Sequence, residues 1–315
     1  MGDTNVYAIK AKDIAIQKKS SSGGAFIVLS DYVLGIGGAI ACSVYSFETH
    51  SMNFYILENQ DERDSAIGSK YVQSCPGTIY EDCFLWIKSH PGKVLLFVGM
   101  GCQAAAFKMY AEQKGIKDSV LIVDIVCHGV PSPQMWRDYV DYIQKKYGGT
   151  LTSLTFKDKR NGWKRPTAAA VVGGKEVFLR DYIRVFNSGM ALRPSCYSCP
   201  YTCIDRQTDL TIGDFWGIEK SHPEFMSQSG VSLVLTHTAM GRDVFECIKA
   251  NFDYIETKAE ECLQPQLEHP SKCSENRSKF WKEYKKRGIN YVMHKYGDVS
   301  IIEKIQYKLK HLLNQ

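Results

Sequence analysis

Long apolar runs are missing from this sequence. No stretch of about 18 apolar residues occurs among its 315 residues, so we expect no transmembrane helix. The segment from Met1 to Ser22 carries lysines and polar residues but no apolar h-region, which argues against secretion and favours a cytoplasmic protein. Internal repeats and low-complexity segments are missing as well.

A strong charge of one sign is also missing. The chain has 39 basic and 34 acidic residues, which leaves a net charge of +5. Much of this excess lies in Lys282–Arg287 and Lys304–His311, so we expect a basic C-terminal surface and no nucleic-acid partner. With 44% hydrophobic and 23% charged residues, the composition is that of a soluble globular protein with a full core.

The cysteine signatures of compact metal sites are incomplete. Cys196-x-x-Cys199 precedes Pro200 and Cys203, but a second Cys-x-x-Cys and a ferredoxin-type run of four cysteines are both missing. A zinc ribbon is thereby excluded, and any four-thiolate site must recruit distant cysteines. Cysteine itself is plentiful, at eleven residues. In a reducing compartment such thiols more often bind metals, catalyse or lie buried than form disulfides.

Two buried-type strands each lead into a glycine turn that bears a cysteine. Lys93–Val98 runs into Cys102 and Val120–Val126 runs into Cys127, and a helical segment follows each turn. This order predicts a βαβ unit with parallel strands. Because ligands gather at the carboxyl ends of parallel strands, we expect both cysteines on one rim of the sheet.

The whole pattern predicts a mixed α/β (α+β) fold. We expect a central mixed sheet with parallel βαβ units flanked by helices, plus a smaller antiparallel region. Three regions are expected: an N-terminal α/β region over 1–150, an α+β region with the cysteine loop over 151–275, and a charged helical tail over 276–315. Further strands are expected at Val6–Lys10, Ala39–Tyr45 and Gly230–Thr236, and a strand with a turn at Leu210–Ile218. Helices are expected at Ala25–Leu34, Tyr80–Ser89, Ala104–Gln113, 133–146 and Gly241–Asn251.

One set of thiols is the favoured metal site. It consists of Cys102, Cys127, Cys196 and Cys199, with Cys203 as a rival fourth ligand. Zinc or a redox dithiol remains open for the Cys-x-x-Cys alone. The other cysteines are expected to be core, surface or loop thiols, namely Cys42, Cys75, Cys83, Cys247, Cys262 and Cys273.

Several glycine and basic segments could contact a phosphate or a flavin, although neither the dinucleotide fingerprint nor a Walker loop is present. The loop Lys157–Lys164 combines four cations with Trp163, which suits an anionic cofactor or a solvated surface. We expect His128 not to form a nucleophile pair with its neighbour Cys127. Asp209 and Asp214 are expected to anchor a turn rather than to transfer protons.

Together these motifs resemble a known family. The segments GSKYVQS, VGMGCQ, VDIVCHGVPSP, KDKRNGW, SCYSCPY and DLTIGDFWGI occur in this order. In combination they are similar to the β-subunit family of coenzyme F420 hydrogenases and dehydrogenases, from about Val6 to Trp281. The resemblance implies a cytoplasmic oxidoreductase with FAD and one [4Fe–4S] cluster, which passes electrons between the cluster, the flavin and a hydride acceptor such as coenzyme F420.

The resemblance also implies roles for individual residues. The cysteines of its motifs, Cys102, Cys127, Cys196 and Cys199, would be the cluster ligands. The SSSGG, KYVQS and KDKRNGW motifs would supply flavin contacts through Ser22, Gly23, Gly24, Lys70, Tyr71, Gln73 and Arg160.

Two departures from the family pattern change the expectations. The N-terminal ferredoxin domain of many relatives is missing, so a separate ferredoxin or partner subunit is expected to exchange electrons with this chain. The usual Thr-Pro-Cys-Gln is Met100-Gly101-Cys102-Gln103 here, which implies a looser turn. Similar proteins accompany surface-polysaccharide enzymes in bacteria, so the substrate need not be the deazaflavin. The competing hypothesis is a zinc-binding or cofactor-free docking subunit; the oligomeric state is open, and an oligomer is allowed.

Overall fold

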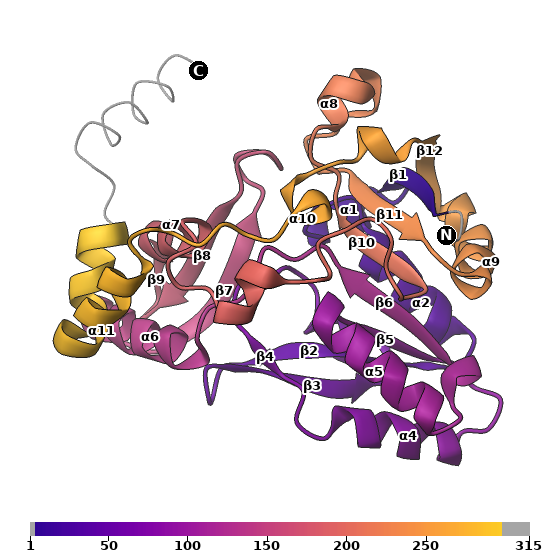
Figure 1. Cartoon of the computed structure of the whole chain (residues 1–315), viewed down its shortest axis with the longest axis horizontal. Coiled ribbons are helices and arrows are strands. Elements are labelled where there is room, and N and C mark those ends of the chain that lie inside the picture. Colours follow the sequence, from indigo (N-terminus) through magenta and orange to yellow (C-terminus); the bar gives the residue numbers. More distant parts are fainter. Residues whose placement is uncertain (1–3, 298–315) are drawn as a thin grey trace.

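Nine strands form one large mixed sheet in this computed structural model, which describes residues 4–297 (Figure 1). Their order across the sheet is β12-β1-β11-β10-β6-β5-β2-β3-β4. The strands are β1 (Asn5–Ala11), β2 (Ala39–Ser46), β3 (Ser51–Leu57), β4 (Ser74–Cys75), β5 (Leu95–Met100), β6 (Val120–Ile125), β10 (Leu210–Asp214), β11 (Ser232–Thr236) and β12 (Phe252–Thr257).

The middle of this sheet is parallel. Strand β5 pairs in parallel with β2 and β6, and β6 pairs in parallel with β10. The sequences of β5 and β6, LLFVGM and VLIVDI, are apolar on both faces because helices cover both sides of the sheet. The antiparallel pairs β10–β11, β11–β1 and β1–β12 extend one side, and β2–β3 extends the other.

Two pairs of helices cover the two faces of the large sheet. Helices α2 (Ala25–Gly35) and α9 (Ala239–Ile248) share a core with one face. Helices α4 (Ile79–Ser89) and α5 (Gly101–Gln113) share a core with the other. The short helices are α1 (Ile14–Lys19), α3 (Gln60–Asp64), α8 (Ile218–Ser221) and α10 (Pro265–Glu268).

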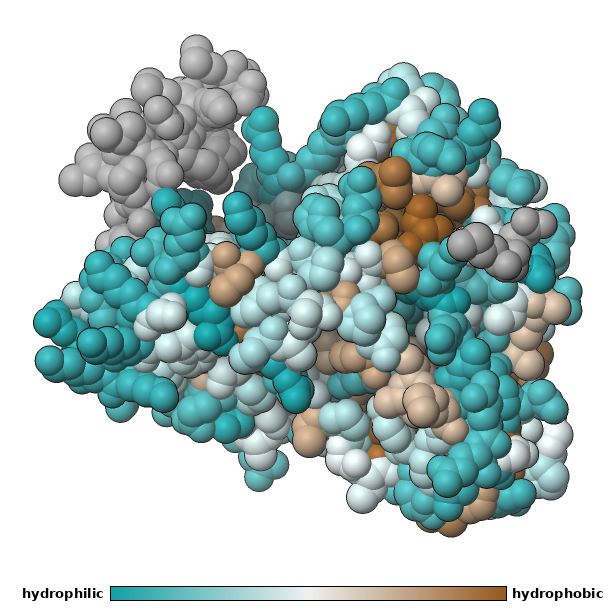
Figure 2. All heavy atoms as spheres, viewed as in Figure 1, coloured by the Kyte–Doolittle hydropathy of each residue, from teal (hydrophilic) through white to brown (hydrophobic). Residues whose placement is uncertain are grey.

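A second, smaller sheet has its own core. It is antiparallel, in the order β7 (Leu151–Asp158), β8 (Thr167–Val172), β9 (Lys175–Phe178). Residues of α6 (Pro133–Tyr147), α7 (Arg180–Asn187) and α11 (Arg277–Val292) join this core, around the buried Trp136 and Tyr182. Figure 2 shows hydrophilic side chains over most of this lobe, whereas hydrophobic patches lie over the lobe with the large sheet.

The structure confirms the predicted fold class, a mixed α/β sheet with a smaller antiparallel region. It also shows elements that the sequence pattern did not predict: the longer ones are β3, β12 and α7, and the shorter ones are β4, α1, α3, α8 and α10. Strands β10, β11 and β12, which follow the small sheet in the chain, return to the large sheet. The predicted tail is helical from Arg277 to Val292, and its part beyond residue 297 lies outside the described residues. No helix within residues 4–297 is long and apolar enough to span a membrane.

Candidate functional site

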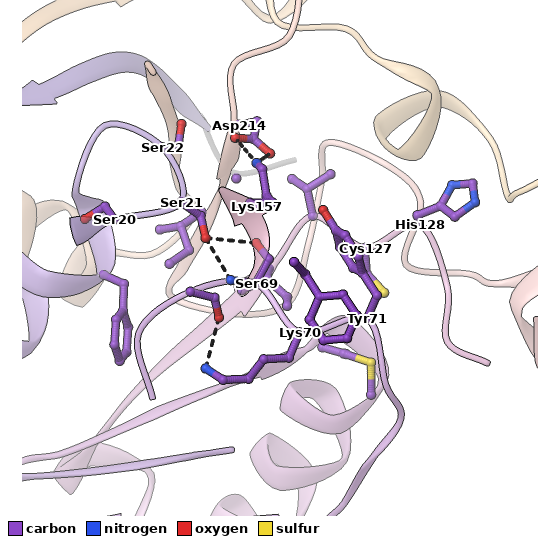
Figure 3. Close-up of a pocket in the computed structure, with 18 of the residues that line it drawn as sticks. Ser20, Ser21, Ser22, Ser69, Lys70, Tyr71, Cys127, His128, Lys157 and Asp214 are labelled. Carbon is purple, nitrogen blue, oxygen red and sulfur yellow. Dashed lines mark hydrogen bonds and ion pairs between the residues drawn. The ribbon is translucent and has the colours of Figure 1, made fainter. Parts of the chain in front are cut away.

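A cavity of about 690 Å³ lies among the loops that follow the parallel strands. Its walls come from the β1–α2 connection, the loop before β4, the ends of β5, β6 and β10, and the inner surface of the small sheet with α7. Figure 3 shows how side chains from these segments converge. The cavity lies at the carboxyl edge of the parallel strands, where α/β sheets place their ligands.

The serine turn before α2 forms one end of the cavity. Ser22 Oγ donates to the Val231 carbonyl at 2.7 Å, and Ser21 Oγ accepts from the Ser69 N–H at 2.7 Å. Ser20 Oγ is buried, lines the cavity and has no hydrogen-bond partner among the described residues. No side chain caps α2, whose N-terminal amides are therefore available to an anion.

Of the two glycines predicted here, Gly24 lines the cavity, whereas Gly23 has a packing role. A Cβ at Gly23 would lie 2.2 Å from the Ile9 carbonyl oxygen and 2.7 Å from the Ser232 nitrogen. Only glycine therefore lets the turn approach β1 and β11 so closely.

Lys70 and Tyr71 form a second wall. Lys70 Nζ donates to the carbonyls of Ala66 (2.6 Å), Ile67 (3.0 Å) and Gly68 (3.0 Å). Burial lowers the pKa of Lys70 to about 8. The Tyr71 ring stacks on Phe186 of α7, with the ring centres 4.7 Å apart. Gln73, the third residue predicted from this motif, is not among the residues that line the cavity.

The basic loop Lys157–Lys164 lines the cavity with other residues than the predicted Arg160. Lys157 lines the cavity and pairs with Asp214 at 2.5 Å, whereas Arg160 pairs with Asp158 and Glu176 at the surface and does not line the cavity. Trp163 is buried, and its ring stacks on Trp216 at 4.7 Å. Trp216, rather than Trp163, presents its side chain to the cavity.

Phe186 and Arg165 are two of the cavity residues that the sequence analysis did not single out. Phe186 belongs to the unpredicted helix α7, and no local signal in the sequence points to it. Arg165 lies on the rim, is exposed, and directly follows the basic loop, which could have indicated it. Its neighbour Lys164 also lines the cavity, and pairs with Glu219 at 2.8 Å.

The four predicted thiols come from three separate segments and lie near one another. Cys102 is in the first turn of α5, Cys127 follows the end of β6, and Cys196 and Cys199 lie in and after the 3-10 turn Pro194–Ser198. Burial raises the pKa of Cys127 to about 12, and the charges of Cys196, Cys102 and Cys199 act in the same direction. Cys102 interacts in this way with Cys196 and Cys199, which also interact with each other.

The thiols are gathered but do not converge on one point. Within residues 4–297, no three His, Cys, Asp or Glu side chains are arranged to hold a single metal ion. A mononuclear zinc site needs sulfurs about 3.8 Å apart, because each Zn–S bond is about 2.3 Å. A cluster lies between its thiolates and separates them further. The rival ligand Cys203 donates from its Sγ to the Asp205 carbonyl at 3.0 Å, and its charge interacts with that of Cys199.

Cys127 connects the thiols to the cavity. It lines the cavity wall, as Tyr71 does (Figure 3). The His128 ring is turned away from that sulfur and lies 3.3 Å from both Gln266 Nε2 and Ser271 Oγ. Asp214 binds Lys157 and the Trp163 indole, and Asp209 binds Lys117 and the Ile122 N–H, so both aspartates anchor their strand.

Comparison with known families assigns the chain. The family model for the C terminus of the coenzyme F420 hydrogenase/dehydrogenase beta subunit matches residues 92–261, which include all four thiols. The chain belongs to this family. Membership indicates an oxidoreductase related to the F420 hydrogenase beta subunit. No curated protein matches the chain.

A solved structure shares the fold of this family member. It is a chain in the xenon-derivatised F420-reducing [NiFe] hydrogenase complex from Methanosarcina barkeri. The similarity covers 93% of this chain and 91% of that chain, with a TM-score of 0.56 and 16% sequence identity.

Proposed function

We propose that this protein is an iron–sulfur flavoprotein oxidoreductase. It relays electrons between a [4Fe–4S] cluster, FAD and a hydride donor or acceptor, which is coenzyme F420 or another small substrate. One observation supports this proposal above the others: Cys127 belongs to the group of four thiols and also lines the cavity. A cluster held by these thiols would therefore adjoin a flavin in the cavity.

The cavity suits a flavin nucleotide in size and polarity. Its volume of about 690 Å³ is within the range of about 300–1,000 Å³ for ligand pockets. The buried Ser20 hydroxyl and the α2 amides suit the phosphates, with Arg165 on the rim as a cation. The aromatic rings of Tyr71 and Trp216 suit the isoalloxazine. We exclude Gly23, Gln73 and Arg160 from this contact set and keep Ser22, Gly24, Lys70 and Tyr71.

The four thiols suit a cluster in the same way. Cys102, Cys127, Cys196 and Cys199 supply four sulfur ligands, the number that a [4Fe–4S] cluster requires. The Gly129 N–H donates to Cys127 Sγ at 3.3 Å, which favours the thiolate. A Cβ at Gly129 would lie 3.4 Å from Cys196 Sγ, so the glycine leaves room for the second sulfur.

A bound flavin would supply both hydride transfer and one-electron steps. The residues of the chain bind and orient it. Tyr71 and Phe186 would shield a bound flavin from water. Lys70 would line the same wall, with its Nζ held by the carbonyls of Ala66, Ile67 and Gly68. Cys102 is exposed, and we propose that a ferredoxin or another partner protein docks at this side of the cysteine loop.

The test is anaerobic purification followed by iron, sulfide and flavin analysis of one sample. We expect about four iron and one FAD per chain. Single Cys→Ser changes at Cys102, Cys127, Cys196 or Cys199 should remove the iron, whereas changes at Cys83, Cys247 or Cys262 should not. Colourless protein with one zinc, or protein that holds no cofactor at all, would overturn the proposal in favour of a structural or docking subunit.

A further inference from the structure

A buried ion pair lies beneath the cysteine loop. Arg206 Nη1 is 2.5 Å from Asp124 Oδ2, and the two side chains are 3% and 1% exposed. Asp124 is near the end of β6, three residues before Cys127, and Arg206 is three residues after Cys203. The pair therefore connects two of the segments that carry the proposed ligands.

Arg206 uses its remaining donors on backbone carbonyls. Its Nε donates to the Cys203 carbonyl at 3.0 Å, which is the end of the cysteine loop. Its Nη1 also reaches the Ile125 carbonyl at 3.4 Å, and its Nη2 reaches the Gln266 carbonyl at 3.4 Å. One planar guanidinium thus fixes the positions of three segments at once.

Asp124 contacts two further segments, the start of β10 and the start of α5. Its Oδ1 accepts from Thr208 Oγ1 at 3.1 Å and from Thr211 Oγ1 at 2.5 Å. Gly101, which precedes Cys102, packs directly against Oδ2, since a Cβ there would lie 3.1 Å away from that oxygen. The same Cβ would lie 2.8 Å from the Cβ of Tyr201, in the cysteine loop.

We propose that Arg206 and Asp124 are positioning residues for the four-thiol site, an inference that rests on the function proposed above. Desolvation offsets much of the attraction in a buried ion pair, so such a pair contributes little net stability compared with apolar residues of the same size. The pair instead holds Cys102, Cys127 and the Cys196–Cys203 loop at fixed separations. The net charge of the pair is zero, and removal of Arg206 leaves an unpaired buried carboxylate three residues before Cys127 in the chain and in contact with Gly101, which precedes Cys102.

Arg206→Gln in the full-length protein tests this role. After anaerobic reconstitution with iron and sulfide, we expect iron to be lost to a chelator roughly 10–100-fold faster than from the parent protein. The midpoint potential of the cluster should fall, because the unpaired Asp124 carboxylate disfavours the reduced form. Arg206→Lys keeps the positive charge but loses the planar guanidinium that bonds several groups at once. This variant should retain iron better than Arg206→Gln but less well than the parent.

The matched control is Arg63→Gln. Arg63 is also buried, at 5% side-chain exposure, and pairs with Asp31 at 2.8 Å and Asp64 at 3.1 Å, away from the thiols. This change should lower the melting temperature without altering the rate of iron loss or the potential. If Arg206→Gln alone does not fold, the neutral double variant Asp124→Asn/Arg206→Gln replaces it, with the same faster iron loss expected.

A second readout separates this inference from the proposed function. In iron-free protein, alkylation of Cys199 and Cys203, followed by mass spectrometry, should be faster in Arg206→Gln than in the parent. Failure of the parent protein to bind iron would overturn the proposed function but leave this comparison valid. Unchanged alkylation, or an Arg206→Gln protein with the parent's iron retention and potential, would overturn the positioning role.

Discussion

Gly101 allows two close contacts at the start of α5. It begins α5, and its missing side chain lets the helix start approach both Tyr201 and the Asp124 carboxylate. The sequence comparison implied a looser turn at Met100-Gly101-Cys102, because the family usually has a proline there. The structure shows a close approach between the turn and the cysteine loop, which a larger residue at position 101 would push apart.

Lys70 gives a prediction about pH. Its pKa is lowered to about 8, while the unfolded chain keeps a value near 10.4. Below pH 8 the folded protein carries the full cost of a buried ammonium, and this cost fades as the pH rises towards the unfolded value. Flavin-free Lys70→Met should therefore be more stable than the parent at pH 7, by at most about 3 kcal/mol, and this advantage should shrink above pH 8.

Urea unfolding of the flavin-free proteins from pH 7 to pH 10 measures this difference. Lys88→Met, which changes an exposed lysine of α4, is the control and should follow the parent curve. A constant difference between Lys70→Met and the parent over this range would contradict the assignment of the lowered pKa.

At the residue scale, the sequence indicated which motifs line the cavity better than which side chains of those motifs reach it. Lys70 and Tyr71, which were predicted as flavin contacts, line the cavity. The side chain of Arg160 turns outward because Asp158 and Glu176 neutralise it at the surface. A sequence cannot show which carboxylates lie across a hairpin from an arginine, and so Arg160 could not be told apart from Arg165.

Helix α7 connects the small sheet to the cavity. Its Phe186 is 2% exposed, stacks on Tyr71 and lines the cavity. We expect Phe186→Ala to cost about 3–5 kcal/mol of unfolding free energy and to weaken flavin binding, because both the core and the cavity wall lose the ring. Flavin titration and urea unfolding of the same preparations measure the two effects.

Phe245→Ala is the matched control for this helix. Phe245 of α9 is 1% exposed and stacks on Tyr7 at 4.2 Å, but it does not line the cavity. The control should lose similar stability and keep the parent's affinity for flavin. Equal loss of affinity in both variants would show that general destabilisation, rather than the cavity wall, explains the effect.

At the element scale, the strength of the local pattern decided what could be predicted. The apolar runs of β5 and β6 and the capped, amphipathic α6 gave clear signals, and all three elements are present. Strand β12 has the sequence FDYIET and lies at the edge of the sheet, where three of its residues are exposed. Its sequence therefore lacks the regular alternation of apolar and polar residues that would predict a strand. Helix α7 was missed because it is short and follows an antiparallel hairpin.

A ligand that contacts both sheets should raise the thermal stability of the whole molecule. The cavity takes walls from both sheets, so a flavin bound there as proposed would stabilise the folded protein through contacts with each sheet. At a FAD concentration of 100 times the Kd, we expect about 2.7 kcal/mol of stabilisation and a rise in Tm of about 4 °C. Differential scanning fluorimetry with FAD, FMN and riboflavin measures it.

Comparison of the three ligands separates the contribution of the phosphate-binding end of the cavity from that of the aromatic residues proposed to contact the isoalloxazine. Riboflavin lacks phosphate and should shift the Tm less than FAD if the serine turn and Arg165 bind the phosphates. Equal shifts would contradict the phosphate site, and no shift with any flavin would contradict the cavity assignment.

At the scale of the whole chain, the sequence predicted the fold class and the grouping of the motifs but not the path of the backbone. Handedness and parallel pairing placed Cys102 and Cys127 on one rim. The return of β10 to the side of β6 brings Asp214 and Trp216 to the same cavity. That pairing depends on long-range packing, which no local pattern encodes.

The pairing of β6 with β10 also has a consequence for biosynthesis. Strand β6 ends at Ile125, but its neighbour β10 begins only at Leu210. While the ribosome makes the intervening residues, β6 has an open apolar edge, and the cavity lacks the wall that follows β10. The nascent chain cannot enclose a flavin at that stage. If the chain binds a flavin as proposed, we expect its loading to follow synthesis of at least the first 216 residues, the last of which is Trp216.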